Sequence, residues 1–416
     1  MLSHLYIHNF KSHLDTSLKL GKISVFIGKN GSGKSSLSQA IALLKQSDTQ
    51  IQWNGDLINL DDFQTVKSRQ SQDDTIKIMI KGNMIPTKDI ATQLDVENIS
   101  YKFQFEFNER GLNRIDYEID GSTKYRFAES LKRNVTPQEQ RLDFEGGQFH
   151  FRKNLSLKNF IMIGGGSSND GELYDRVHDA LNNFLNTFTN QLELCYLIPA
   201  TRGFDQSSYQ LLDEVAKIQT SKGVTRQAEM SVTTMAHQYD IQEKITEFAR
   251  QVIPDVSIHV RNLPQKRARI VNKDKYGEYG ITNEGFGLNQ SIFLFMQLAM
   301  AQPNATIFID EPEISLHPAS QTSLSRVLID DSTKENHQFI ITTHSEHILI
   351  GLLEGVMDGK ILPEDLTVYY FDKIDGTTKT SKLEVTERGE VKGGMKGFFE
   401  VNIGHIDKFI ENLKKK

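Results

Sequence analysis

The eight residues from Gly28 to Ser35, GKNGSGKS, constrain the fold of this chain more than any other feature of its sequence. They fit the pattern G-x-x-x-x-G-K-[ST], in which the backbone N–H groups of a glycine-rich loop surround a phosphate group. The pattern requires a strand before the loop and a helix after it. The apolar run Ile23–Ile27 predicts that strand, and the residues from Ser35 onward predict the helix. We therefore predict a phosphate-binding strand–loop–helix unit within an α/β fold.

The residue types in this loop suit a triphosphate that is bound together with a divalent cation. Glycine lets the backbone adopt the conformations that aim N–H groups at the phosphates. Lys34 supplies a positive charge to the β- and γ-phosphates, and Ser35 offers a hydroxyl group to Mg²⁺. The helix N-terminus beyond Ser35 adds its partial positive charge. The expected binding residues of the loop are Gly28, Asn30, Gly31, Ser32, Gly33, Lys34, Ser35 and Ser36.

Two adjacent carboxylates follow a second apolar run, Thr306–Ile309, where a buried strand normally ends at a turn residue. In phosphoryl transfer, one such carboxylate holds Mg²⁺ through water, while the other orients and deprotonates the attacking water. We assign the first role to Asp310 and the second to Glu311. Asp-Glu-Pro at a strand end also occurs simply as the start of a helix. The loop at Lys34 favours the catalytic interpretation.

A third apolar strand, Phe339–Thr342, also ends in polar residues, Thr343 and His344. Because the carboxyl ends of parallel strands meet at one edge of a sheet, we expect His344 to reach the γ-phosphate. A lone histidine is more often a structural residue. Its assignment as a catalytic residue, alongside Lys34 and Glu311, therefore depends on the other two motifs.

Strands and helices alternate at both ends of the chain, whereas the middle has a different pattern. We expect a parallel sheet covered by helices and assembled from both termini. Alternating apolar and polar residues between about residues 47 and 158 predict an antiparallel β insertion. Helices are predicted at residues 170–192 and over most of residues 209–252, with a break near Gly223. The expected divisions are residues 1–200 for the first half of the sheet domain with the insertion, 201–255 for a helical lobe, and 256–416 for the second half.

Composition limits the classes of protein and partner. The 48 basic and 54 acidic residues give a net charge of −6, so any contact with nucleic acid must be a local patch. Cys195 is the only cysteine, which excludes an intrachain disulfide and a cysteine-rich zinc site and favours a reducing compartment. The first residues lack the basic and apolar regions of a secretion signal, and no apolar run is long enough to span a membrane. We expect a cytoplasmic protein without a membrane partner.

Taken together, these motifs resemble those of ABC-type ATPase heads of the SMC, RecF and OLD kind. The resemblance rests on Walker A at Gly28–Ser35, Walker B at Ile307–Glu311 and a switch histidine at His344, with about 270 residues between the two Walker motifs. The segment Ile7–His13 also resembles the start of these heads, which implies that Lys11 and Ser12 lie beside the nucleotide. Four further segments resemble the bacterial group called AAA family ATPases, namely Asn283–Gln290, Asp310–Gln321, Thr343–His347 and Ile361–Leu366.

The resemblance implies a P-loop NTPase fold of the ABC type and an ATPase that uses ATP and Mg²⁺. It also implies a head-to-tail homodimer or larger homo-oligomer, in which a signature loop of one copy closes on the ATP bound by another. Here that loop is Gly285–Gln290, and its expected contacts in trans are Gly287, Asn289 and Gln290. Asn289 stands where the L-S-G-G-Q pattern has a serine. A simple turn before a helix is the alternative interpretation.

Two basic segments have open assignments. The resemblance places a Q-loop after the strand Leu194–Leu197, yet no glutamine occurs there before Gln206. Arg202 serves at the Q-loop position or pairs with an acid of the sheet, and the sequence leaves both alternatives open. A second segment flanks an expected hairpin and is either a DNA contact, with salt-sensitive binding, or a hairpin facing only solvent. Its basic residues are Lys266, Arg267 and Arg269.

No nuclease motif accompanies the ATPase motifs in the sequence, so the resemblance implies that an effector is supplied by a partner. We expect a Mg²⁺-dependent ATP-hydrolysing switch subunit that oligomerises and regulates a separate nuclease in bacterial anti-phage defence. The Septu system, with its HNH nuclease, is the first candidate, and PARIS, with its Toprim effector, is the second. The alternatives are a stand-alone RecF-like ATPase of DNA repair or recombination that binds double-stranded DNA, and a scaffold that binds ATP but barely hydrolyses it.

Overall fold

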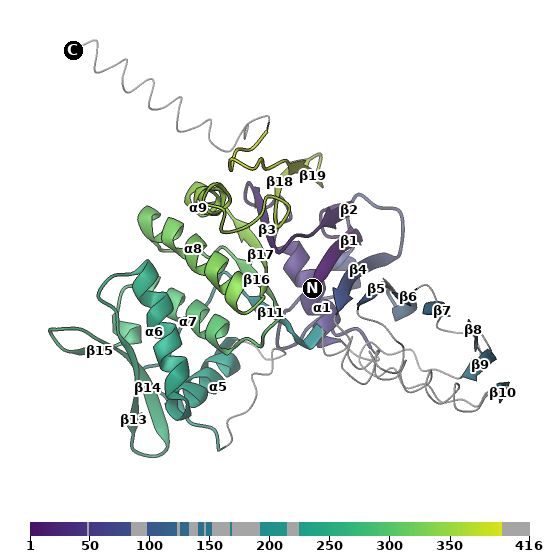
Figure 1. Cartoon of the computed structure of the whole chain (residues 1–416). Helices are drawn as coiled ribbons and strands as arrows, with labels where there is room; N and C mark the ends of the chain where they lie inside the picture. Colours follow the sequence, from purple (N-terminus) through teal and green to yellow (C-terminus); the bar gives the residue numbers. More distant parts are fainter. Residues whose placement is uncertain are drawn as a thin grey trace, which may run out of the picture.

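The computed structural model describes residues 1–47, 50–84, 98–122, 125–132, 140–144, 147–151, 167–168, 192–213 and 224–392. At its centre lies a six-stranded sheet in the order β11-β16-β17-β3-β18-β19 (Figure 1). Neighbouring strands are parallel except β18 and β19. The strands are β3 Ile23–Gly28, β11 Cys195–Ile198, β16 Thr306–Asp310, β17 Gln338–Thr343, β18 Leu366–Ile374 and β19 Thr377–Leu383. Because β3 lies between two strands from the other end of the chain, the predicted assembly from both termini is confirmed.

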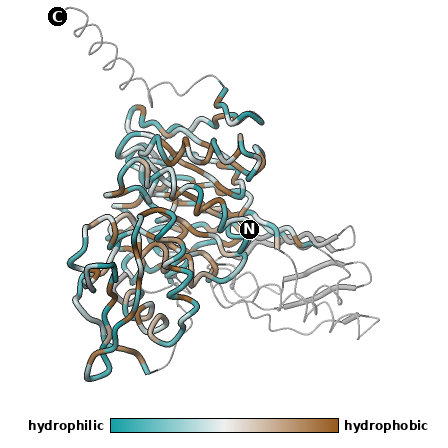
Figure 2. Tube along the Cα trace, turned by 60° about the vertical axis from the view of Figure 1, so that its left-hand side comes forward, coloured by the Kyte–Doolittle hydropathy of each residue, from teal (hydrophilic) through white to brown (hydrophobic). Residues whose placement is uncertain are grey.

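The two faces of the central sheet contact different layers, because side chains alternate along each strand. In β3, Ile23, Val25 and Ile27 belong to one hydrophobic core, whereas Phe26 belongs to the other. Helices of the C-terminal half cover the first face, namely α7 Phe286–Met300, α8 Pro318–Lys334 and α9 Glu346–Met357. Helix α1, Ser36–Gln46, packs on the second face. Apolar segments accordingly run through the interior in Figure 2. Within the described ranges, no helix is long and apolar enough to cross a membrane.

An antiparallel sheet packs over α1 on the side away from the central sheet, in the order β2-β1-β4-β5-β6-β7. Its strands are β1 Leu2–Phe10, β2 His13–Lys19, β4 Ile76–Met84, β5 Ile99–Asn108, β6 Gly111–Ser122 and β7 Tyr125–Lys132. A short helix, α2 Phe63–Val66, precedes β4. A three-stranded sheet of β8 Gln140–Phe144, β9 Gly147–Phe151 and β10 Ser167–Ser168 follows. These sheets confirm the predicted antiparallel β insertion; β2, which forms a hairpin with β1, was not predicted.

A lobe of helices and short strands packs beside α7 and α8 (Figure 1). It contains α5 Val224–His237, α6 Tyr239–Val252, β12 Tyr209–Gln210, β13 Ile258–Leu263, β14 Arg267–Lys273, β15 Glu278–Gly280 and the 3₁₀ helix η1 Ile281–Asn283. The predicted helical character is confirmed for α5 and α6. It is wrong for Tyr209–Gln210, which pairs with β14 because the Tyr209 ring is buried and its hydroxyl is bound by Asp205. The expected helix at residues 170–192 and the break at Gly223 lie outside the described residues, apart from Leu192.

A buried polar pair joins α8 to the strand that follows it. Asp331 Oδ2 lies 2.6 Å from His337 Nδ1, and His337 Nε2 lies 3.0 Å from the Gln302 carbonyl oxygen. Both side chains of the pair are at most 1% exposed. A buried donor that loses its acceptor pays the full cost of desolvation. The pair therefore fixes how α8 returns the chain to β17.

We expect Asp331→Ala to lower the free energy of unfolding by about 3–5 kcal/mol, because it leaves a buried ring nitrogen without its partner. Chemical denaturation measures the change. Glu335→Ala, which removes the partner of Lys244 in a part-exposed ion pair at the end of the same helix, is the control and should cost less than about 1 kcal/mol. Equal losses from the two variants would contradict this role for Asp331.

Candidate functional site

The loop between β3 and α1 requires glycine at two positions. Gly28 ends β3 with φ 148°, and a Cβ atom there would lie 2.1 Å from the carbonyl oxygen of Phe371. Gly33 has φ 101°, and a Cβ atom there would lie 2.4 Å from Thr378 Oγ1. Ser35 caps α1, so the loop leads directly into the helix N-terminus. The predicted strand–loop–helix unit is therefore present, with both glycines in conformations that favour glycine.

The Lys34 ammonium group has two partners within this unit and a third, His344, beyond the end of β17. Its Nζ atom donates to the carbonyl oxygens of Gly28 at 2.8 Å and Lys29 at 3.0 Å, and it lies 3.1 Å from His344 Nε2. Burial lowers the pKa of Lys34 to about 8, although the nearby charges of Glu311 and other acids raise it. A phosphate oxygen must therefore replace one of these acceptors when it binds Lys34.

The strand predicted at Thr306–Ile309 is present as β16, which ends at Asp310, and Glu311 follows it at the same edge of the sheet. The Asp310 carboxylate accepts hydrogen bonds from Thr342 Oγ1 at 2.9 Å and Ser38 Oγ at 3.1 Å. Burial raises the pKa of Asp310, whereas these two hydroxyl groups lower it. The Ser38 hydroxyl also lies 2.9 Å from the Ser35 carbonyl oxygen, which connects the carboxylate to the first turn of α1.

His344 brings the three motifs together. Its Nε2 atom lies 3.1 Å from Lys34 Nζ and 3.6 Å from Glu311 Oε1. Burial and the Lys34 charge lower the pKa of His344, and the Glu311 charge raises it. The backbone N–H of His344 donates to Glu313 Oε1 at 2.7 Å. This contact was not predicted, although Glu313 lies two residues after Glu311. Burial raises the pKa of Glu313, and its second carboxylate oxygen has no hydrogen-bond partner among the residues that the structure describes.

Strand register explains why these residues meet. Asp310 of β16 pairs with Thr342 of β17, and Thr343 of β17 pairs with Ile27 of β3. The polar residues at the ends of these strands, Asp310 and Thr343, and those directly after them therefore lie at the same edge of the sheet. Since the edge is formed by parallel strands, a shift of one residue would turn Asp310 or Thr342 to the opposite face.

A pocket of about 1300 Å³ opens beside this edge. Most of the predicted nucleotide-site residues line it, namely Lys11, Ser12, Asn30, Gly31, Gly33, Lys34, Ser35, Ser36, Glu311 and His344. Gly28, Ser32 and Asp310 are not on this lining. Ser32 is 1% exposed, and Asp310 lines a smaller pocket of about 120 Å³ together with Ser38 and Gln39. Four further cations on the lining were not predicted, namely Lys29, Lys67, Arg69 and Lys373. Lys29 stands at a variable position of the loop pattern, and the other three lie in segments without a motif. The pocket is rich in positive charge, which suits a polyphosphate.

Two residues that bind the backbone of the loop, His13 and Thr378, were not predicted. His13 is fully buried, and its Nε2 atom lies 3.0 Å from the Gly33 carbonyl oxygen while its Nδ1 atom lies 2.8 Å from Thr16 Oγ1. Burial lowers the pKa of His13 to about 4, so the ring is neutral and donates from Nε2 to the carbonyl. Thr378 Oγ1 donates to the Ser32 carbonyl oxygen at 2.8 Å. His13 stands next to the predicted Ser12, but Thr378 has no local signal in the sequence.

Arg202, the residue at the expected Q-loop position, lies beneath the carboxylate turn and does not line the pocket. Its side chain is 6% exposed. Its guanidinium donates to the carbonyl oxygens of Asp310 at 3.0 Å and Glu311 at 3.1 Å. The group therefore binds the backbone of the acidic turn rather than a carboxylate.

The predicted signature residues belong to the first turns of α7, which begins at Phe286. Asn289 is 8% exposed, and its side chain binds both the N–H and the carbonyl of Phe204, at 2.7 and 2.9 Å. Gly287 lies so close to Ser315 that a Cβ atom would be 2.3 Å from the Ser315 carbonyl oxygen. Phe286, by contrast, is 64% exposed. A contact in trans from this segment stays a prediction, and Asn289 already has two partners within its own chain.

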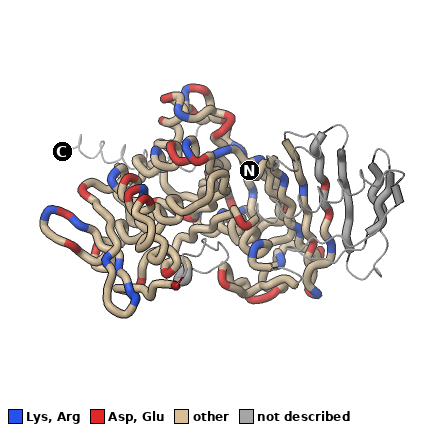
Figure 3. Tube along the Cα trace, turned by 60° about the horizontal axis from the view of Figure 1, so that its bottom comes forward, with Lys and Arg blue, Asp and Glu red and all other residues tan. Residues whose placement is uncertain are grey.

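The basic segment lies on the predicted hairpin, formed by β13 and β14. Lys266 is at the hairpin tip and pairs with Asp213 at 2.8 Å, both side chains being more than 70% exposed. Arg267 donates to the Ser208 carbonyl oxygen at 2.6 Å, and Arg269 lies opposite Arg261 on β13. Figure 3 shows basic and acidic segments side by side on the hairpins of the lobe.

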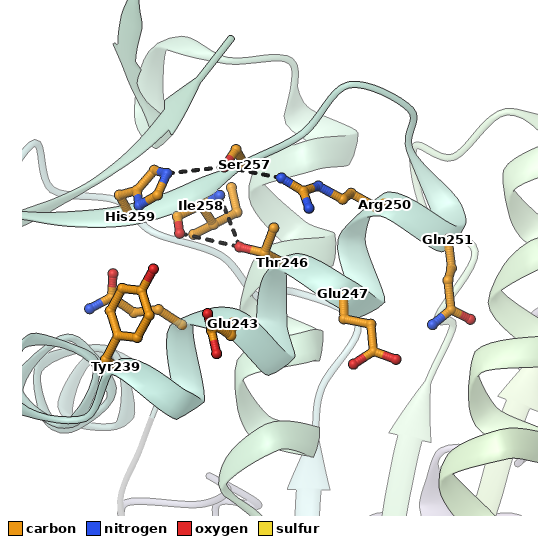
Figure 4. A pocket seen from close by; sticks show the side chains of 10 residues that line it. Tyr239, Glu243, Thr246, Glu247, Arg250, Gln251, Ser257, Ile258 and His259 are labelled. Atoms are coloured by element: carbon orange, nitrogen blue, oxygen red, sulfur yellow. Dashed lines mark hydrogen bonds between the residues drawn. The ribbon is translucent and has the colours of Figure 1, made fainter.

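A second hollow, of about 710 Å³, lies between α6 and β13. Its walls carry charges of both signs, including Glu243, Glu247 and Arg250 (Figure 4). Ser257 Oγ lies 3.0 Å from His259 Nε2 and 3.4 Å from Arg250 Nη2. The bond from Arg250 joins α6 to the residue before β13, so these contacts form part of the lobe.

The oxygen donors of the first site fit Mg²⁺. Mg²⁺ prefers oxygen ligands and is usually bound by one or two protein groups together with substrate phosphates and water. The Ser35 hydroxyl and the Asp310 carboxylate supply such ligands, and the Ser38 hydroxyl lies between the Asp310 carboxylate and the backbone carbonyl of Ser35. A cation there would also offset the cost of burying the charged Asp310 carboxylate.

We expect polyphosphate binding to take up protons near pH 8.5. Lys34 has a pKa of about 8, so up to about three-quarters of its amine is neutral at pH 8.5, and a bound anion raises that pKa. Affinity should therefore fall as the pH rises above about 8. Calorimetry of ATP binding in buffers of different ionisation enthalpy measures the uptake. Lys34→Arg should take up no protons, and equal heats for the unmodified chain in all buffers would contradict the assignment.

The sequence matches the model of the family described as the AAA ATPase domain over residues 1–349. No match is found among curated proteins. Solved structures that are similar to this chain include an Smc head bound to the C-terminal winged-helix domain of ScpA, at 13% identity and a TM-score of 0.49 over 92% of this chain and 98% of that chain. The SMC head domain from Thermotoga maritima is 13% identical, with a TM-score of 0.44 over 92% and 99% of the two chains. The Smc head domain with an extended coiled coil, bound to the C-terminal domain of ScpA derived from Pyrococcus furiosus, is 12% identical, with a TM-score of 0.48 over 99% of both chains.

The family match covers the loop at Gly28–Ser35, the acidic turn at Asp310–Glu311 and His344. It agrees with the predicted α/β fold of a P-loop ATPase, with its antiparallel insertion and lobe, and nucleotide binding with ATP hydrolysis is the activity for which the family is named. This chain belongs to the AAA ATPase domain family.

Proposed function

We propose that this chain is a Mg²⁺-dependent, ATP-hydrolysing switch subunit that pairs with further copies of itself and controls a separate effector nuclease in bacterial anti-phage defence. The observation that carries the ATPase part is the contact among three motifs far apart in the sequence. His344 Nε2 lies 3.1 Å from Lys34 Nζ and 3.6 Å from Glu311 Oε1. If the loop holds a triphosphate, the side chains of Lys34, Glu311 and His344 would all lie at its terminal phosphate.

In the proposed reaction, Lys34 and the N–H groups of the loop bind the β- and γ-phosphates. Glu311 orients the attacking water and accepts its proton, and His344 contacts the γ-phosphate. The Ser35 hydroxyl and the Asp310 carboxylate hold Mg²⁺, which neutralises charge on the phosphates when bound. Lys11 and Ser12, on the pocket lining, assist in binding the nucleotide.

The effector part of the proposal rests on the resemblance to bacterial defence ATPases and on the ATPase family. A Septu-like system with an HNH nuclease is the first candidate and a PARIS-like system with a Toprim effector is the second, both in the cytoplasm. In such an arrangement, two copies would sandwich ATP, with the α7 segment at Gly287, Asn289 and Gln290 facing the partner's nucleotide.

A stand-alone RecF-like ATPase that binds double-stranded DNA is the second candidate. The exposed Lys266 at the tip of the β13–β14 hairpin favours it, since a phosphate could compete with Asp213 for this side chain. Arg267 and Arg269 would add to the same patch. The two candidates share the ATPase site and differ in what it controls.

We expect Lys34→Ala to abolish ATP binding and Glu311→Gln to retain it while lowering kcat by about 10²–10³-fold, because only the general base is lost. Equilibrium ATP binding and steady-state hydrolysis separate the two effects. Lys392→Ala and Glu384→Gln, from an exposed ion pair outside the pocket, serve as matched controls and should hydrolyse ATP normally. Hydrolysis by Glu311→Gln at the parental rate would show that Glu311 is not the base.

The regulatory part is tested by a tagged pull-down from the native host, with mass spectrometry of the copurified proteins and native mass measurement with and without ATP. A nuclease-sized partner in a fixed ratio, together with an ATP-dependent increase in copies of this chain, is the expected result. An ATPase that copurifies with DNA and without a protein partner would favour the RecF-like function instead.

A further inference from the structure

The backbone of Glu311 has a conformation that a residue with a side chain adopts only under constraint. Its φ angle is 49°, in the left-handed region that favours glycine. The Glu311 N–H donates to the Thr342 carbonyl oxygen at 2.8 Å, which ties the turn to β17. The Glu311 carbonyl accepts from Arg202 Nη2 at 3.1 Å. Both peptide groups of the residue are thus held by other segments.

Arg202 binds three successive carbonyl oxygens of this turn. Nη1 donates to Asp310 at 3.0 Å, and Nη2 donates to Glu311 and Pro312, each at 3.1 Å. Nη1 also donates to Pro199 at 3.1 Å, close to the end of β11. A planar guanidinium has five donors in a fixed fork, whereas an ammonium group has three donors at a single point. Burial lowers the pKa of Arg202 to about 10, so the group stays charged at neutral pH.

We propose that Arg202 is a positioning residue for ATP hydrolysis, which holds the left-handed turn so that the Glu311 carboxylate faces His344 and Lys34. The inference rests on the proposed role of Glu311 as the general base. Arg202 does not line the nucleotide pocket, so it acts through the turn and not through a contact with ATP.

The segment that carries Arg202 is itself fixed. Gly203 has φ 119°, which lets the chain turn sharply after Arg202. Phe204 then donates its N–H to Asn289 Oδ1 at 2.7 Å and accepts from Asn289 Nδ2 at 2.9 Å. The guanidinium therefore approaches the acidic turn from a rigid support, as a positioning role requires.

Arg202→Lys tests the inference, because it keeps the charge and removes the fork. We expect kcat to fall by about 10²-fold and the dissociation constant for ATP to change by less than about threefold, since only the placement of Glu311 is lost. Arg250→Lys is the matched control. Arg250 also donates to a backbone carbonyl, that of Val256 at 3.0 Å, but lies in the lobe, and its replacement should leave kcat unchanged.

A second comparison separates positioning from a general loss of structure. In the Glu311→Gln background, Arg202→Lys should lower the residual rate by less than about twofold, because residues that act through one group are not additive. A full additional loss in this background would overturn the inference, as would an unchanged kcat in Arg202→Lys alone. If Arg202→Lys does not fold, Arg202→Gln, which retains two donors, is measured in the same way and judged by the same outcomes. Failure of the base assignment is recognised separately, because Glu311→Gln would then hydrolyse ATP at the parental rate.

Discussion

The position of β3 between β17 and β18 is the constraint on which the site depends. It brings the loop of the N-terminal segment beside two strands encoded more than 300 residues later, in a register that pairs Ile27 with Thr343. Parallel pairing then places the ends of β3, β16 and β17 at one edge. The contact between Lys34 and His344 exists only because this register holds. Packing of both faces of the sheet therefore stabilises the fold and the chemistry together.

Burial and opposite charge compete throughout the site. Lys34 loses part of its preference for the charged form through burial, and the acids of the β16 turn restore some of it. Burial likewise raises the pKa of Asp310 and Glu313. A bound cation would stabilise the charged form of these carboxylates, and a bound polyanion would stabilise the charged form of Lys34. The backbone of the site is also strained, because Glu311 is held with φ 49°. Such a site is arranged for ligands that carry both signs of charge.

The sequence predicts those parts of the site that are encoded in short segments. Lys34, Glu311 and His344 each follow an apolar strand, so periodicity and the parallel-sheet rule were enough to bring them to one edge. His13 and Thr378 are different, because each binds the loop from a strand whose position depends on the complete fold. β12 was missed for the same reason, since two residues carry no period and the strand exists through its pairing with β14.

The segment after β11 links the ATPase site to the lobe through consecutive contacts. Arg202 holds the carbonyls of the acidic turn, Phe204 is held by Asn289 at the start of α7, and Tyr209 pairs with Ala268 of the hairpin. A conformational change in the Glu311 turn must therefore be accommodated by these few residues or must also move α7 and the hairpin. Because Asn289 binds both backbone groups of Phe204, the segment has little freedom to absorb it locally. If ATP acts on the chain as proposed, these contacts connect the site physically to the outer surface of the lobe.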